Sequence, residues 1–403
     1  MTGAERTARV MARADELGRI SEEEGRLTRR FATPALVEAG RVIAGWMEEA
    51  GLEVAIDAVG NVRGRNGVAG APLVIGSHYD TVRDAGRYDG PLGVLCAIEV
   101  AAALGETAGP LEVVAFSDEE GTRYAVAYLG SSAYRGRFEP AWLALEDADG
   151  VTMAAALEAV GGDGEAATRQ VGEPIAGYLE VHIEQGPVLE DEELPVGVVG
   201  AIVGQTRIRV ELTGRAGHAG TVPAALRADA LAGAAELVLA VEEAMKATSG
   251  LVATVGELVV EPGAANVIPG KAVLSLDVRH AEDPIRDGAV RELHEAATQL
   301  AAWRGLALDW QVLQSTASMR MSATLVESLS SAIVPEGFAV RSLVSGAGHD
   351  AVIVGRDAPA AMLFVRCLGG VSHSPLESVE EADVAVALSV LERALRARAQ
   401  ASA

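Results

Sequence analysis

The sequence predicts an α/β fold, in which a mostly parallel sheet with helices on its faces carries an inserted, ferredoxin-like α+β domain. Short apolar segments alternate with helical patterns before residue 205 and again after residue 316. Between these limits the pattern changes to β-α-β-β-α-β. Hydrophobic residues make up 49% of the 403 residues, which is enough for two or three domains of roughly 150 residues with cores of their own.

The first part of the chain, residues 1–204, is expected to begin the larger, catalytic domain. Helices are predicted over residues 4–17, 34–50 and 90–104, and strands over residues 73–76, 111–116 and 178–183. The third helix has Pro91 in its first turn, where the missing N–H group of proline costs nothing. Alternating strands and helices favour parallel neighbouring strands, because parallel strands need a long crossover, which is usually a helix.

Residues 205–316 are predicted to form the inserted domain. Its elements are a strand over 206–212, a helix over 223–244, strands over 251–260 and 271–279, a helix over 284–303 and a strand over 307–313. The first helix is amphipathic, because Leu226, Leu237 and Val241 recur on one face. Residues 317–403 then return to the catalytic domain, with helices over 322–334 and 380–396 and a strand over 362–365.

Composition and charge exclude several classes of protein. Lys and Arg total 33 and Asp and Glu total 57, and the resulting net charge of −24 repels nucleic-acid backbones. Two cysteines are too few for a disulfide scaffold. The N-terminus carries charges throughout, and the apolar run Val94–Ala103 is shorter than the roughly 20 residues of a membrane span. We therefore expect a cytoplasmic protein without nucleic-acid or membrane partners.

Four of the predicted strands share one feature, because histidine or acidic residues follow closely on the carboxyl end of each. These residues are His78, Asp80 and Asp89 for the first strand, Glu119 and Glu120 for the second, His182 for the third and His373 for the fourth. In an open parallel sheet these ends face one crevice, where ligands bind. A lone histidine usually has a structural role, which we assign to His280 and His294, but four such strand ends are hard to attribute to chance.

Three imidazoles and adjacent carboxylates at one crevice would form a nitrogen–oxygen metal site. Their number suits two divalent ions about 3.5–4 Å apart, bridged by a carboxylate such as Asp89. Asp80 is placed to accept the second N–H of the His78 imidazole, a usual outer-shell role. Of Glu119 and Glu120, one would bind metal and the other would act as general base, and spacing leaves open which does which.

Six motifs occur in order between about residue 35 and the C-terminus. They are Gly76-Ser77-His78-x-Asp80-Thr81-Val82, Tyr88-Asp89-Gly90-x-x-Gly93-Val94, Asp118-Glu119-Glu120-Gly121-x-Arg123, His182-Ile-Glu184-Gln185-Gly186-Pro187, Gly217-His218-Ala-Gly220-Thr221 and Ser372-His373-Ser-Pro375. Together they resemble the amidase/carbamoylase branch of the aminoacylase-like co-catalytic zinc peptidase superfamily. That branch contains allantoate amidohydrolase, N-carbamoyl-L-amino-acid hydrolase and β-ureidopropionase.

The resemblance implies two metal ions, zinc or manganese with cobalt and nickel as alternatives. His78 and His182 would bind one ion, Glu120 and His373 the other, Asp89 would bridge them, and Glu119 would be the general base. In the peptidases of the superfamily a carboxylate usually stands where His182 stands here, so a dipeptidase or aminoacylase is a weaker alternative.

The resemblance also implies that the inserted domain is a lid through which a homodimer forms. His218 would approach the partner subunit's site and stabilise the oxyanion. The substrate-binding residues would be Gln185, Asn266, Arg279, Gly348 and His349, of which Asn266 and Arg279 would hold the substrate carboxylate. For Arg279, a surface ion pair with Asp277 or Glu282 is the alternative.

The expected substrate is a small carboxylate with a ureido or carbamoyl group, and allantoate is favoured within ureide catabolism. Residues 80–90 and Arg366-Cys367 lean towards allantoate amidohydrolase, since carbamoylases tend to carry Pro-Ser at the latter place. Arg366 would offer a fixed cation near His373, although an ion pair with a structural acid explains it equally well. The alternatives are N-carbamoyl-L-amino-acid hydrolase or β-ureidopropionase and, more remotely, a non-catalytic metal-binding paralogue.

Overall fold

The computed structural model describes residues 2–402, which form two compact units. The first unit contains the chain up to Gly200 and again from Met321, and the second is Ala201–Arg320. These divisions lie four residues outside the boundaries expected from the sequence, at 204 and 316. Each unit has a hydrophobic core of its own.

The first unit is built on a sheet with the strand order β1-β2-β4-β3-β5-β15-β6, in which β14 also pairs with β6. The strands are β1 Glu53–Ile56, β2 Val62–Arg65, β3 Leu73–His78, β4 Leu111–Phe116, β5 Gly177–Ile183, β6 Val196–Ile202, β14 Ser342–Ser345 and β15 Ala360–Val365. The four central strands, β4, β3, β5 and β15, run parallel, and β2 and β6 flank them in the antiparallel direction. The predicted, mostly parallel sheet is confirmed.

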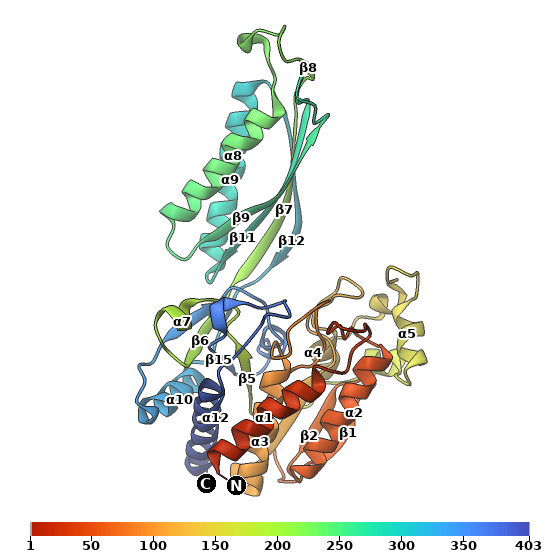
Figure 1. Cartoon of the computed structure of the whole chain (residues 1–403), viewed down its shortest axis with the longest axis vertical. Helices are drawn as coiled ribbons and strands as arrows, with labels where there is room; N and C mark the ends of the chain where they lie inside the picture. The colour runs from red at the N-terminus through yellow and green to blue at the C-terminus, as the bar shows by residue number, and fades with distance from the viewer. Residues whose placement is uncertain (1, 403) are drawn as a thin grey trace. The chain divides into compact units, whose positions relative to one another are not determined.

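Helices cover this sheet (Figure 1). They are α1 Gly3–Leu17, α2 Pro34–Glu49, α3 Pro91–Leu104, α4 Leu129–Tyr134, α5 Met153–Ala159, α6 Gly164–Arg169, α7 Val188–Asp191, α10 Ala323–Ile333, α11 Ala351–Val354 and α12 Glu381–Ser402. α3 packs on β3, β4 and β5 and also contacts α1 and α12, so most of its residues are buried, including Glu99, which pairs with Arg9 and Arg13 of α1. The segment Pro91–Ala108 is long and apolar enough to cross a membrane, yet 67% of it lies buried in the core.

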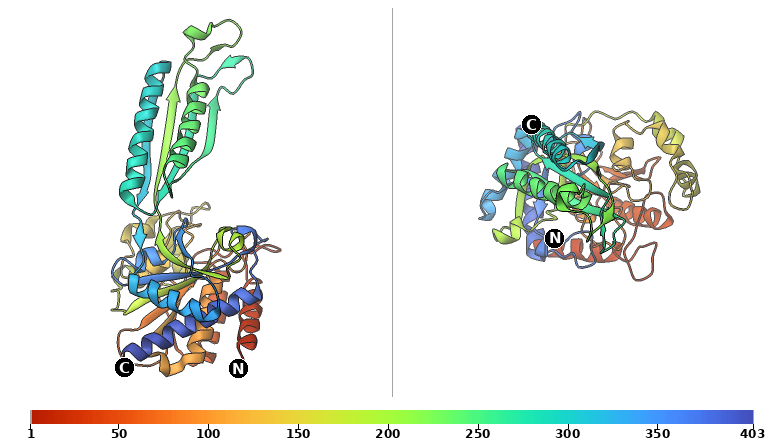
Figure 2. Two further views of the ribbon diagram at one scale, coloured as in Figure 1. Left: turned by 90° about the vertical axis from the view of Figure 1, so that its left-hand side faces the viewer. Right: turned by 90° about the horizontal axis from the view of Figure 1, so that it is seen from above.

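The second unit has the element order β-α-β-β-α-β. Its elements are β7 Gly204–Thr213, α8 Ala230–Ala247, β9 Val252–Glu261, β11 Lys271–His280, α9 Asp283–Arg304 and β12 Ala307–Thr316. The strands form an antiparallel sheet in the order β12-β7-β11-β9, and the two helices lie along one face of it (Figure 2). The side chains of β11 alternate between buried and half-buried, because successive residues point to opposite faces. A separate two-stranded ladder pairs β8 Gly217–His218 with β10 Val267–Ile268.

One helix begins later than the sequence predicts. The helix predicted over 223–244 corresponds to α8, which begins only at Ala230, because the Asp229 side chain caps it by accepting a first-turn N–H. The preceding residues Ala224–Leu226 form a separate 3₁₀ turn. Leu226, predicted on the buried face, is 62% exposed. The capping aspartate therefore marks the boundary better than the apolar periodicity does.

We expect Gly93→Ala to destabilise the chain and Gly45→Ala to leave it intact. A β-carbon at Gly93 in α3 would lie 1.9 Å from the Val181 carbonyl oxygen of β5, so helix and sheet would have to move apart. Overpacking of this kind costs about 1–3 kcal/mol. Gly45 also lies inside a helix, α2, but nothing beyond that helix lies within 4 Å of its β-carbon position.

Alanine at position 45 should therefore stabilise the chain by about 0.5–1 kcal/mol through its higher helix propensity. Thermal unfolding followed by circular dichroism measures both effects. Equal melting temperatures for the two variants would show that α3 does not pack on β5 as closely as described.

Candidate metal centre

The carboxyl ends of the four central strands meet at one edge of the sheet and bring the candidate ligands together. His78 is the last residue of β3, and His182 is the penultimate residue of the adjacent strand β5. Glu119 and Glu120 follow β4, and His373 lies in the loop after β15. The first two histidines and Glu119 are buried, Glu120 is nearly so, and His373 is half exposed.

Asp89 lies among these residues, and its two carboxylate oxygens face different partners. Oδ1 is 3.1 Å from His182 Nε2 and 3.9 Å from His78 Nε2. Oδ2 is 3.3 Å from His373 Nε2, which is in turn 3.5 Å from Glu120 Oε1. The ligand atoms of each group of three lie within 4.8 Å of one another. One carboxylate therefore joins two potential metal-binding groups.

The hydrogen bonds of the two buried histidines show that the first group fits a cation. His78 Nδ1 lies 3.2 Å from the Asp80 carbonyl oxygen, and His182 Nδ1 lies 3.0 Å from its neighbouring carbonyl oxygen, so each Nδ1 carries the hydrogen. When both rings are neutral, their Nε2 atoms have free lone pairs, and these two atoms face each other at 3.4 Å. Two nitrogens at roughly 2.0–2.1 Å from one tetrahedral zinc would be about 3.3 Å apart. Asp89 Oδ1 is buried beside them without a hydrogen-bond partner among the described residues.

Asp80 connects the first histidine to the glutamate loop. Its Oδ1 lies 3.2 Å from His78 Nδ1 and accepts a hydrogen bond from the Glu119 N–H at 3.0 Å. Its Oδ2 accepts a hydrogen bond from the Glu120 N–H at 3.3 Å. One buried carboxylate thus orients an imidazole and two backbone positions, and these are the contacts expected of an outer-shell residue.

One glycine and two polar side chains fix the orientation of Asp89. A β-carbon at Gly90 would lie 2.5 Å from the His78 ring, and the φ of 85° there also favours glycine. Gln185 Nε2 donates to Asp89 Oδ2 at 2.8 Å, and the Ser372 hydroxyl donates to the same oxygen. The Gln185 amide, assigned to the substrate pocket from the sequence, is therefore bonded to the Asp89 carboxylate.

Burial and the crowding of acids shift the pKa values of this centre. Burial raises the pKa of Glu119 well above its usual value, although His78 opposes the shift. Burial and the nearby Asp89 raise the pKa of Glu120 to about 7. Burial acts on Asp89 as well, yet its contacts with His182 and His373 hold its pKa well below the usual range. Buried acids of this density are costly without a counter-ion, so the centre suits bound cations.

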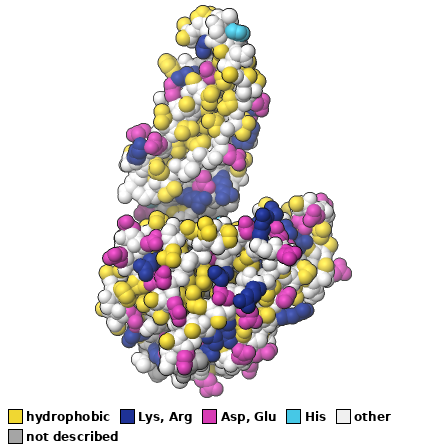
Figure 3. Space-filling view, in the orientation of Figure 1, with side chains coloured by type: hydrophobic (Ala, Val, Ile, Leu, Met, Phe, Trp, Pro, Cys, Tyr) yellow, Lys and Arg dark blue, Asp and Glu magenta, His cyan; other side chains and the backbone are white. Residues whose placement is uncertain are grey.

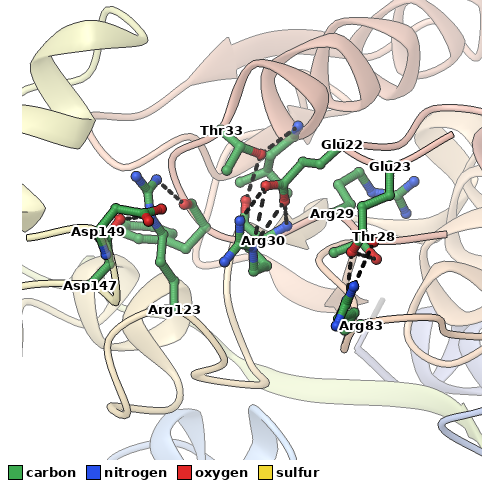
Figure 4. A network of polar contacts seen from close by, with 12 residues as sticks. Glu22, Glu23, Thr28, Arg29, Arg30, Thr33, Arg83, Arg123, Asp147 and Asp149 are labelled. Atoms are coloured by element: carbon green, nitrogen blue, oxygen red, sulfur yellow. Dashed lines mark hydrogen bonds and ion pairs between the residues drawn. The ribbon is translucent and has the colours of Figure 1, made fainter. Parts of the chain in front are cut away.

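Two arginines that Figure 4 labels, Arg29 and Arg123, form hydrogen bonds that hold the loops after β3 and β4. Arg29 is fully buried and donates through Nε to the Tyr79 carbonyl oxygen at 2.7 Å, one residue before the outer-shell aspartate. Arg123, three residues after Glu120, donates through Nη1 to two carbonyl oxygens of the segment 31–32. A single segment of chain therefore supports the loops after β3 and β4.

His349 and Gly348, also assigned to the substrate pocket, lie beside the first histidine pair. The buried His349 ring lies edge-on to His182, with ring centroids 4.5 Å apart, and its Nε2 is 2.9 Å from the Ser345 hydroxyl oxygen. Burial and the proximity of His182 hold the pKa of His349 well below its usual value, so this ring is neutral. A β-carbon at Gly348 would lie 1.8 Å from the Tyr128 hydroxyl, so only glycine leaves room for that phenol. Contact of either residue with substrate stays a prediction.

In the second unit the structure brings His218 and Asn266 together. His218 in β8 pairs with Val267 in β10, directly after Asn266. The Asn266 carbonyl oxygen also accepts a hydrogen bond from the Ala219 N–H. Figure 1 shows this ladder at one end of the unit's sheet.

Arg279 lies elsewhere in the same unit. It is eight residues beyond Lys271, the start of β11, which is about 27 Å along a strand at roughly 3.4 Å per residue. It donates to both carboxylate oxygens of Asp277 at 2.7 and 3.0 Å, which is the ion pair weighed from the sequence. One copy of this unit therefore does not place Asn266 and Arg279 on the same small carboxylate.

Three residues near the centre escape the sequence analysis. Glu180 in β5 offers a ligand atom within 4.8 Å of those of His182 and His349. The Ser372 hydroxyl donates to Asp89 Oδ2, and Glu377 accepts a hydrogen bond from the Asp89 N–H. Glu180 and Ser372 lie within two residues of the predicted ligands His182 and His373, so their positions in the sequence could have marked them as candidates. Glu377 acts through backbone N–H groups, which no motif marks.

A family model of the peptidase family M20/M25/M40 matches residues 74–397. The chain belongs to this family. The resemblance and the α/β fold inferred from the sequence are confirmed, and this M20/M25/M40 member is a metal-dependent hydrolase that acts on C–N bonds.

Relatives of this M20/M25/M40 chain include two named hydrolases. A probable allantoate deiminase from Oryza sativa subsp. japonica is 41% identical over 420 residues, covering 93% of this chain and 85% of the relative. An N-carbamoyl-L-amino acid amidohydrolase from Geobacillus stearothermophilus is 38% identical over 393 residues, covering 95% and 96%. The crystal structure of an amidase of the hydantoinase/carbamoylase family from Burkholderia multivorans matches with a TM-score of 0.91 at 33% identity and covers 98% of each chain.

We expect Asp80→Ala to weaken metal binding by about 10–100-fold, the usual effect of losing an outer-shell partner. The change removes the carboxylate oxygen beside His78 Nδ1, leaving that nitrogen only the backbone carbonyl of residue 80, and it leaves two backbone N–H groups without an acceptor. Competition with a chromophoric chelator measures the affinity. Asp309→Ala removes an exposed carboxylate of β12 and is the control. An affinity that is the same in both variants would refute the outer-shell role.

Proposed function

We propose that the chain hydrolyses a ureido C–N bond of a small carboxylate substrate at a dinuclear metal centre, with allantoate as the substrate. The products would include ammonia and carbon dioxide. The observation that carries the proposal is that the two oxygens of Asp89 face separate groups of ligands. The relative from rice supports allantoate, and the relative from Geobacillus supports a second candidate, an N-carbamoyl-L-amino acid.

Each oxygen of Asp89 would serve one ion. His78 and His182 would complete the first group, and Glu120 and His373 the second. The nitrogen and oxygen donors suit zinc or manganese, and cobalt or nickel would also fit. When bound, the two ions polarise the substrate carbonyl and lower the pKa of water.

Glu119 is the proposed general base. Glu120 groups with Asp89 and His373. Glu119 groups with His78 and Glu120, but within residues 2–402 no group that includes Asp89 contains it. This difference supports Glu120 as the ligand, a choice that spacing leaves open. Burial raises the pKa of Glu119, and so makes it a stronger base than an exposed glutamate. Glu119 would take the proton of the attacking water and return it to the leaving nitrogen.

A site shared by two copies of the chain would explain why the expected substrate-binding residues of the second unit lie far apart in one copy. His218 and Asn266 lie together, and Arg279 lies far along β11, so all three can serve one substrate only if they come from different copies. His218 would then stabilise the oxyanion in the partner subunit's site. α8 and the edge strand β9 expose Leu239 and Val259, and hydrophobic atoms spread over this unit in Figure 3, which supports a homodimer formed there.

Arg366 does not support the choice of allantoate. Its guanidinium forms a bidentate ion pair with Asp383 of α12, at 2.7 and 2.9 Å. Of the two explanations that the sequence leaves open, the structural acid therefore holds. The choice of allantoate as substrate is supported instead by the relative from rice and by the sequence of residues 80–90. The cytoplasmic location and the lack of nucleic-acid or membrane partners stay predictions, supported by the net charge of −24.

Glu119→Gln should lower kcat by about 10²–10⁴-fold, the usual contribution of a general base, while both ions stay bound. Ammonia release and metal content measure the two effects. Glu120→Gln is the matched control, because it should lower the metal content first. Turnover by Glu119→Gln within about threefold of the wild type would refute the role of Glu119 as base.

A substrate panel distinguishes the candidates. Chain stripped of metal by a chelator should be inactive, and refilling with zinc, manganese, cobalt or nickel should restore ammonia release. We expect the highest kcat/KM for allantoate, compared with N-carbamoyl-L-amino acids and N-carbamoyl-β-alanine. A higher value for either of the others would replace allantoate, and no turnover after refilling would favour the non-catalytic paralogue.

A further inference from the structure

Glu377 is a buried carboxylate that touches the loop carrying Asp89. It lies four residues after His373, before α12 begins, and it is 3% exposed. Its Oε1 accepts hydrogen bonds from the N–H groups of Tyr88 at 2.7 Å and of Asp89 at 3.1 Å. Its Oε2 is buried and has no hydrogen-bond partner in the part of the chain that the structure describes.

The loop also packs closely around this side chain. A β-carbon at Gly86 would lie 2.3–2.4 Å from Cβ, Cδ and Oε1 of Glu377. The φ of Gly86 is not in the left-handed region, so glycine is needed here for space rather than for backbone freedom. The contact between the Asp89 loop and the Glu377 side chain is therefore tight as well as hydrogen-bonded.

These contacts affect the two proposed ion groups unequally. His78 and His182 are placed by strands β3 and β5, and their Nδ1 atoms have partners of their own. His373 lies outside any strand, at a φ of 54°, in the segment that leads to Glu377. Glu377 thus connects the His373 segment with the backbone of Asp89. His373 belongs only to the second group, whereas Asp89 belongs to both.

We propose that Glu377 is a positioning residue that holds Asp89 and His373 in register, so that the second ion binds tightly. The inference rests on the metal centre of the proposed function. Without the carboxylate, two buried N–H groups lose their acceptor and the Asp89 loop is free to move away from the His373 segment. The first group keeps its strand-borne histidines and is affected less.

Three variants of the full chain test this inference. Glu377→Ala removes the acceptor, and Glu377→Gln keeps one side-chain oxygen in its place. Asp57→Ala is the matched control, because Asp57 Oδ1 also accepts two backbone N–H groups, those of Val59 and Asn61 at 3.0 Å, in a loop without candidate ligands. Zinc binding is measured by competition with a chromophoric chelator, and folding by circular dichroism and the melting temperature.

We expect Glu377→Ala to weaken the second zinc ion by about 10–100-fold. The first ion should be weakened less, by under about tenfold, because its group loses only the placement of Asp89 and keeps both histidines. Excess zinc should then restore kcat. Glu377→Gln should bind both ions within about threefold of the wild type, and Asp57→Ala should lower the melting temperature without changing zinc affinity.

The inference is overturned if Glu377→Ala binds both ions like the wild type, or if it weakens both equally. It is also overturned if Asp57→Ala weakens the second ion as much. These outcomes leave the proposed function standing. A wild-type chain that binds fewer than two ions would instead contradict the proposed function, and this inference with it.

Discussion

The two-sided contact of Asp89 controls the geometry of the whole centre, because one carboxylate must present its oxygens to two groups of ligands at once. Its backbone stands at the start of α3, and Gly90 lets the chain pass close to the His78 ring. Gln185 and Ser372 then fix the direction of Oδ2. A small rotation of this side chain would break contacts with both groups, so several neighbours serve the orientation of a single residue.

The density of buried acids links the stability of this region to cation binding. Asp80, Asp89 and Glu119 are all buried at the edge of the sheet. A cation that binds the folded chain and not the unfolded one stabilises the fold by its binding free energy. Arg29 adds a positive charge near Asp80, and although burial lowers its pKa to about 10, it remains charged at neutral pH.

The candidate ligands could be predicted from apolar runs that indicate buried strands, from the polar residues that follow those runs, and from the rule that parallel strands end at one edge of a sheet. Apolar runs such as 73–76 and 111–116 predict buried strands, and the residues that follow them carry ligand atoms. Parallel strands then bring these ends to one edge. This reasoning needs no knowledge of individual long-range contacts, so the placement of His78, Glu119 and His182 at that edge follows from the sequence alone.

Features that depend on distant partners were not predictable in the same way. For Arg366 the sequence leaves open a fixed cation near His373 and an ion pair with a structural acid, and only the structure identifies that acid as Asp383, 17 residues away. Asn266 and Arg279 are close in sequence, yet the length of β11 separates them. Glu377 contacts only backbone N–H groups, which are the same in every sequence.

Anomalous scattering from a crystal of the metal-loaded chain tests the central claim most directly. The account predicts two metal peaks about 3.5–4 Å apart, one on each side of the Asp89 carboxylate. The first should contact His78 and His182, and the second should contact Glu120 and His373. A single peak, or two peaks that do not share Asp89, would contradict it.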